Sequence, residues 1–256
     1  MLKYNNQKEL NENFSEKKIQ INVLSPILNL LDGNYNDYFI NPDLASSPLK
    51  ILLEKCGTIF NVSGWDIFFK CIDLILFNED EEKKNLEILY KMFEEIFNEY
   101  RDKLSILNIE VILDVLEKFS LQLENKNISY SSLSFFWQCA DIIEQYQKNK
   151  KEIKGYELEC FNEKVEKNKE NIFYNNLWKK LFNKLLIINK DKRFDIKKSG
   201  INLFSQFFVA KLKTINLINN LSNSIFTEIF YVVFKTNIEE YLSQENNNNI
   251  NNNENN

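Results

Sequence analysis

The stretch NLEILYKMFEEIFNEY, residues 85–100, decides the fold class of this chain. Its apolar side chains recur at three- and four-residue spacings: Leu86, Leu89, Tyr90, Phe93, Ile96, Phe97 and Tyr100. In a helix of 3.6 residues per turn, this spacing places them in one stripe along one face. A helix with a single apolar stripe buries it against another element. The stretch therefore predicts an amphipathic helix within a packed array of helices.

The same spacing recurs on both sides of this stretch. The other segments that show it are 49–60, 65–76, 109–119, 133–143, 177–185, 196–210 and 225–234. Asn127 or Ser129 is the expected cap of the helix that carries 133–143. Only five glycines and three prolines occur in 256 residues, and sheets joined by tight turns need both residue types. We therefore expect an all-α fold.

The helices are expected to be joined by short links in antiparallel pairs of about 40 residues, which is typical of a HEAT/armadillo-like helical-repeat solenoid. A closed helical bundle is the alternative. We expect the repeat domain to span 19–241, with a charged insertion near 147–172. Residues 1–18 and the Asn-rich segment 242–256 are expected to be disordered, because such polar sequence cannot bury enough apolar surface to fold.

Composition argues against catalysis. The chain has no histidine, so the commonest general base is missing. Its widely spread glycines form no phosphate-binding loop. The four cysteines, Cys56, Cys71, Cys139 and Cys160, form no CxxC pair and are expected to be buried thiols. We expect no enzyme activity, no cofactor and no metal site.

Charge and hydropathy indicate where the chain acts. The net charge is −5, which disfavours the broad cationic surface that duplex nucleic acid requires. We see no signal peptide and no apolar run long enough to span a membrane. We expect a cytoplasmic chain that can still lie on a membrane surface.

Three tryptophans, Trp65, Trp137 and Trp178, lie at the start or middle of expected helices, beside apolar neighbours. We expect them to be core anchors of successive repeats. The alternative is that an exposed tryptophan docks a partner peptide.

A second cluster begins at Asp191 and continues in RFDIKKSGINLF, residues 193–204. Asp191 is expected to cap the following helix, and Arg193 to reach an equivalent acid in the next repeat. Ser199 and Gly200 fall in mid-helix, where glycine costs about 1 kcal/mol relative to alanine. Close approach by a neighbouring helix is the expected compensation.

The same region is basic. Between residues 179 and 198 there are eight cations and two anions. Four of the lysines, Lys190, Lys192, Lys197 and Lys198, form a candidate edge that binds anionic lipid or a protein partner. The alternative is that these lysines are dispersed and only solvated.

Three blocks of sequence resemble one protein family in the same order. They are CGTIFNVSGWDIFFKCIDLI (56–75), NISYSSLSFFWQCADII (127–143) and LWKKLFNKLLIINKDKRFDIKKSGINLFSQFF (177–208). The chain resembles, over about 45–235, the Mon-two (monensin-sensitivity) family of large Golgi and endosomal scaffolds, which is related to the large BIG-type Arf exchange factors. Those proteins are far longer, and the exchange domain has no counterpart in this chain.

The resemblance implies a scaffold segment that is peripheral on Golgi and endosomal membranes and acts by protein–protein binding in vesicle-mediated transport. The partners it implies are a Dopey-type protein, a phospholipid flippase or an Arf-like GTPase. A regulatory HEAT segment of a large Arf exchange factor is the first alternative, and an exchange domain encoded upstream would favour it. A nucleic-acid-binding helical repeat is the second, and the acidic balance of the chain counts against it.

Overall fold

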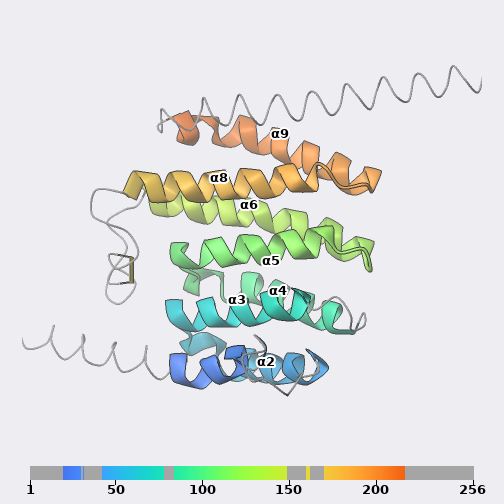
Figure 1. Ribbon diagram of the computed structural model, residues 1–256. Helices are drawn as coiled ribbons and strands as arrows, with labels where there is room; N and C mark the ends of the chain where they lie inside the picture. The colour runs from blue at the N-terminus through green and yellow to red at the C-terminus, as the bar shows by residue number, and fades with distance from the viewer. Residues whose placement is uncertain are drawn as a thin grey trace, which may run out of the picture. The chain divides into compact units, whose positions relative to one another are not determined.

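The computed structural model describes residues 20–29, 31, 42–77, 84–148, 160–161 and 170–216. Every regular element in these ranges is a helix, so the predicted all-α class is confirmed (Figure 1). The predictions for 1–18, for most of the insertion at 147–172, for 225–234 and for 242–256 lie outside the described residues.

The chain divides into two compact units, 1–184 and 185–256. In the first unit, a helical segment at 20–29 precedes the main helices. These are α2 (Pro42–Cys56), α3 (Val62–Phe77), α4 (Lys84–Glu99), α5 (Ile109–Leu121), α6 (Lys126–Lys148) and the greater part of α8 (Glu170–Ile188). Single 3-10 turns lie at Gly57–Ile59, Arg101–Lys103 and Ile106–Asn108. The second unit begins with the last turn of α8 and continues into α9 (Phe194–Asn216).

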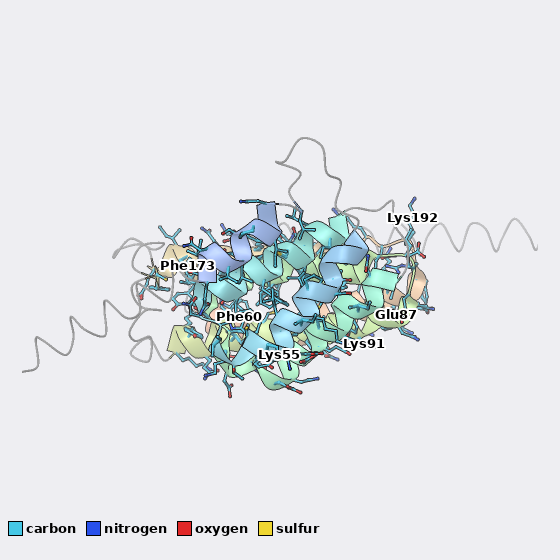
Figure 2. The ribbon with its side chains drawn as sticks, turned by 90° about the horizontal axis from the view of Figure 1, so that it is seen from below. Lys55, Phe60, Glu87, Lys91, Phe173 and Lys192 are labelled. Carbon is cyan, nitrogen blue, oxygen red and sulfur yellow. The ribbon has the colours of Figure 1, made fainter. Side chains whose placement is uncertain are left out.

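Helices that are two apart in the chain pack against one another in the first unit. α4 packs against α2 and α6, while α3 packs against α5. α5 also packs extensively against α6, the next helix along the chain. Figure 1 shows α2, α3, α5 and α6 following one another upward as layers. Figure 2 views the packed pair α2 and α4 from below, with Lys55 labelled on α2 and Lys91 on α4.

The apolar stripe of 85–100 lies in the core of this unit. Five of its side chains are buried: Leu89, Tyr90, Phe93, Ile96 and Phe97. Phe93 joins four helices, because its ring lies 6.0 Å from Phe69 of α3, 5.5 Å from Phe119 of α5 and 5.4 Å from Phe135 of α6, between ring centroids. Offset and edge-to-face aromatic pairs at these distances stabilise a core beyond the area that they bury.

Asparagine side chains start two of the helices. Asn61 accepts hydrogen bonds from the backbone N–H groups of Ser63 and Gly64, at 3.0 and 3.2 Å, at the start of α3. Asn125 does the same for Asn127 and Ile128 at the start of α6, at 3.0 and 3.3 Å. These bonds satisfy N–H groups that have no partner within the helix.

The predicted cap of α6, Asn127 or Ser129, is therefore wrong. Ser129 is buried, and its hydroxyl donates to the backbone oxygen of Gln122 at 3.1 Å. Gln122 Nε2 donates in return to Ser129 Oγ at 2.8 Å. The serine thus closes the corner between α5 and α6, and the cap lies two residues before the nearer predicted position.

Candidate functional site

Two of the three tryptophans are fully buried. The ring of Trp65 packs among Phe60, Phe68, Phe69 and Tyr100, with centroid distances from 5.1 to 6.1 Å. Buried aromatic rings of this size dominate the energetics of a core. This burial favours the core-anchor interpretation of Trp65 over a docking role.

Trp178 and Trp137 differ in exposure. Trp178 of α8 is fully buried, and its indole N–H donates to Gln147 Oε1 of α6 at 3.2 Å. Trp137 of α6 is half-buried, because it lies between the buried Phe136 and the exposed face that carries Ser134. Of the three tryptophans, Trp137 is therefore the one that is not fully buried.

The turn between α8 and α9 is braced by one acid–base pair. Asp191 Oδ1 accepts from the backbone N–H of Arg193 at 2.7 Å and from Arg193 Nε at 3.0 Å. Arg193 Nη2 donates to Asp191 Oδ2 at 2.5 Å. Burial disfavours the charged carboxylate, but these bonds to Arg193 outweigh it and hold the pKa of Asp191 below its usual range.

This pairing refines what was predicted for the turn. α9 begins at Phe194, and its first helical bond runs from Lys197 N–H to the backbone oxygen of Arg193. Asp191 therefore closes the turn that enters α9, through an Asx-type bond to the residue before the helix. A ladder from Arg193 to an acid of another repeat stays a prediction.

Gly200 lies at a close approach between α8 and α9. An added Cβ would lie 2.6 Å from Asn189 Oδ1 and 3.0 Å from Ile188 Cγ2. The expected compensation for a glycine in mid-helix, close approach by a neighbouring helix, is therefore present at the C-terminal end of α8. Ser199, beside it, is half-buried.

The structure keeps three of the four lysines of the predicted basic edge on the surface. Lys190, Lys192 and Lys198 are exposed, and Lys192 projects outward in Figure 2. Lys197 is only 7% exposed, so its placement on the edge is wrong. The reason is helical phase: Lys197 falls three residues before the buried Gly200 and seven before the buried Phe204, on the inward face of α9.

Two other cations of the basic run are bound by an acidic stripe on α5. Lys180 Nζ lies 2.7 Å from Asp114 Oδ2 and 3.7 Å from Glu110 Oε1. Lys184 Nζ lies 2.8 Å from Asp114 Oδ1 and also pairs with Glu117. The acids are spaced four and three residues apart and the lysines four apart, so each set occupies one helix face.

Titration of this network follows from its contacts. Burial disfavours ionised Asp114, but hydrogen bonds and charge from Lys180 and Lys184 prevail, so its pKa is lowered. Burial likewise disfavours the charged form of Lys184, while Asp114 and Glu117 raise its pKa above the ordinary value. Both shifts favour the ionised pair, so these lysines hold α8 against α5. The spacing of the three acids is visible in the sequence, but the sequence does not show that α8 packs against them.

Sequence reasoning also missed Phe194, the first residue of α9. Its side chain is 64% exposed, and it lies four residues before the exposed Lys198, on the same helix face. The available signal was its position between the charged Arg193 and Asp195, outside the apolar stripe of α9.

Other reactive groups lie in the core. Burial raises the pKa of the Cys71 thiol to about 12 and also raises that of Cys139, so both are protonated near neutral pH. In the described part of the chain, no group of three or more Cys, Asp or Glu residues could hold a metal ion. No described helix combines the length and apolar character needed to cross a bilayer.

The chain is similar to the protein named MON2 of Saccharomyces cerevisiae, with 26% identity over 136 residues. The match covers 48% of this chain and 8% of that protein, so this chain spans less than a tenth of the length of that relative. No protein-family model and no solved structure matches. The similarity supports the resemblance to the Mon-two family at a distance, and it leaves the relation to the exchange factors a prediction.

Proposed function

We propose, from this distant similarity and the all-α fold, that the chain is a non-catalytic helical-repeat segment that acts as a scaffold in Golgi and endosomal membrane trafficking. It works by binding proteins along a stacked helical surface. The observation that carries the proposal is the packing of helices two apart in the chain: α2 with α4, α3 with α5, and α4 with α6.

This packing pattern favours a HEAT/armadillo-type solenoid over a closed bundle. In a solenoid, alternate helices stack on one another in two layers, and each repeat contacts its neighbours. In a closed bundle, all helices share a single core. Here α2 packs against α3 and α4 but makes no comparable contact with α5 or α6, so the described helices do not all share one core.

Ion pairs between helices that are not consecutive in the chain support the same arrangement. Lys118 of α5 lies 2.8 Å from Asp73 Oδ1 of α3 and also donates to the Asp73 backbone oxygen at 2.8 Å. One turn earlier on α5, Asp114 lies 2.8 Å from Lys184 of α8. Paired charges along a stack fix its register and leave the outward faces of the helices for partners.

Partners and location come from the resemblance to the Mon-two family. It implies a Dopey-type protein, a phospholipid flippase or an Arf-like GTPase as the bound protein, on the cytoplasmic side of Golgi and endosomal membranes. The related possibility, a regulatory segment of an Arf exchange factor, predicts that an exchange domain is encoded in the same gene.

Microscopy and targeted capture test the proposal. The chain, tagged in its own cells, should co-localise with Golgi or endosomal markers and should recover a protein of one of these three classes after crosslinking. The matched control is a Trp65→Ala and Trp178→Ala double variant, in which we expect the fold to be lost because both rings are fully buried. A folded chain that is diffuse in the cytosol and recovers none of the three classes contradicts the proposal.

A further inference from the structure

We propose that the turn between α8 and α9 docks on an anionic lipid surface, with Phe194 inserted among the headgroups and Lys190, Lys192 and Lys198 bound to them. These four residues are called the α8–α9 tip. The inference deepens the peripheral-membrane part of the proposed function and rests on it. It adds a specific contact site and a specific ligand chemistry.

The first argument is the fixed exposure of an aromatic ring. Phe194 is 64% exposed although phenylalanine is among the residues most often buried. Its exposure is set by the backbone: Asp191 and Arg193 brace the turn, and the inward face of α9 begins at Ile196. The turn therefore presents the ring outward, where it can be buried in a lipid interface without any change of fold.

The second argument is charge complementarity around that ring. Lys190 and Lys192 are exposed before it, and Lys198 lies on the same helix face one turn after it. The acidic groups of this segment are Asp191, which is bound to Arg193, and Asp195, which is exposed. Three exposed lysines thus outnumber one exposed acid. Each lysine near an anionic leaflet strengthens partitioning by about fivefold.

A lipid surface fits these features better than a protein does. A protein partner would need a shaped pocket for one protruding ring and carboxylates placed to match three separate lysines. A bilayer interface accepts the ring without a shaped pocket, and its negative charge is spread over the surface that the lysines reach. The docking is expected to be weak and sensitive to salt, because exposed charges are screened.

Vesicle co-sedimentation of the whole chain tests the inference. The probe is phosphatidylcholine vesicles with and without phosphatidylserine, at low and high salt. Wild-type chain should bind the vesicles that contain phosphatidylserine and be released by salt. Phe194→Ser should weaken binding by about fivefold, and Lys192→Glu with Lys198→Glu by more than tenfold.

Two matched controls lie outside the tip. Val209 of α9 is 80% exposed, and Lys179 of α8 is exposed. Val209→Ser and Lys179→Glu should change binding by less than about twofold. Circular dichroism of each variant checks that the fold is kept. As a second readout, the tryptophan fluorescence of Phe194→Trp should shift to the blue when vesicles are added and should be quenched by brominated lipid. Both changes should be larger than those of the wild-type chain.

The outcomes are separable. Equal binding to both kinds of vesicle, or equal losses for Phe194→Ser and Val209→Ser, overturns the inference. Loss of capture of a protein partner by Phe194→Ser without vesicle binding also overturns it, in favour of a protein surface. If the chain does not bind vesicles but the tagged chain still reaches the Golgi or endosome, the lipid-docking inference fails and the scaffold proposal stands. If the chain binds vesicles but stays diffuse in cells, the scaffold proposal fails and the lipid-docking inference stands.

Discussion

Two neighbouring parts of the sequence use the same residue types in opposite ways. The part of α8 in the first unit carries a buried aromatic ring, Trp178, and two lysines, Lys180 and Lys184, that are paired with acids of α5. The α8–α9 tip carries an exposed ring, Phe194, and three exposed lysines. The presence of an aromatic residue among lysines in the sequence therefore does not determine whether the ring is buried or exposed. What decides its role is whether an opposing helix supplies apolar surface and carboxylates.

The two aromatic rings give the largest expected difference. Trp178→Ala should destabilise the first unit by about 3–5 kcal/mol, because it removes a fully buried ring and leaves a cavity. Phe194→Ala should change stability by less than about 0.5 kcal/mol, because that ring is mostly in solvent. Urea unfolding followed by circular dichroism measures both. Similar losses for the two variants would show that the contrast between the regions is false.

The two sets of lysines give the next contrast. Lys184→Ala should cost about 1–2 kcal/mol, because it removes the ion pair of the half-buried Glu117 and leaves Asp114 with Lys180 alone. Lys192→Ala should cost less than about 0.5 kcal/mol, as expected for an exposed side chain. A double-mutant cycle of Lys184 with Asp114 isolates the pair. A coupling energy near zero would mean that the ion pair contributes nothing to the contact between α5 and α8.

These contrasts show what sequence patterns can and cannot predict. The apolar stripe of 85–100 predicted a helix, and Leu89, Phe93 and Ile96 in it are fully buried, because periodicity within one helix specifies its inward face. The close approach at Gly200 was also expected, from the cost of glycine in a helix.

The errors arose where the answer depends on a second segment. The eight cations at 179–198 were considered together, although α5 binds two of them and Asp191 binds Arg193. The basic run predicts Lys197 on the surface together with its neighbours, whereas the helical phase of α9 turns it inward. No local pattern states which helix face will meet an acidic stripe, so pairing between distant segments could not be predicted.

The stability of the α5–α8 contact should depend on pH. Asp114 has a lowered pKa, so its contribution to stability is present above its unfolded pKa of about 3.9 and is lost as pH falls through the folded value. Lys184 has a raised pKa, so its contribution is present at neutral pH and is lost only as pH rises through the folded value.

The difference in stability between wild type and Lys184→Ala should therefore be largest near neutral pH and should shrink below about pH 4. Urea unfolding at a series of pH values measures it, with Lys192→Ala as the variant expected to show no such trend. A difference that stays constant down to pH 3 would show that Lys184 acts through its aliphatic stem and not through its charge.

The smallest expected effect concerns the turn that shapes the tip. Asp191→Ala should cost about 0.5–1 kcal/mol, because it removes the bond to the Arg193 N–H and the guanidinium contact while leaving α9 its own hydrogen bonds.

Asp191→Asn is the sharper variant, since its side-chain oxygen can still accept from the Arg193 N–H but its charge is gone. If the backbone bond carries the effect, Asn should restore most of the stability that Ala loses. If the ion pair carries it, Asn and Ala should be equally destabilised, and the loss should diminish as pH falls through the lowered pKa of Asp191. Thermal unfolding of the three proteins at neutral and acidic pH separates these cases. An unchanged melting temperature for Asp191→Ala would mean that the brace does not order the turn, and that the exposure of Phe194 is set by α9 alone.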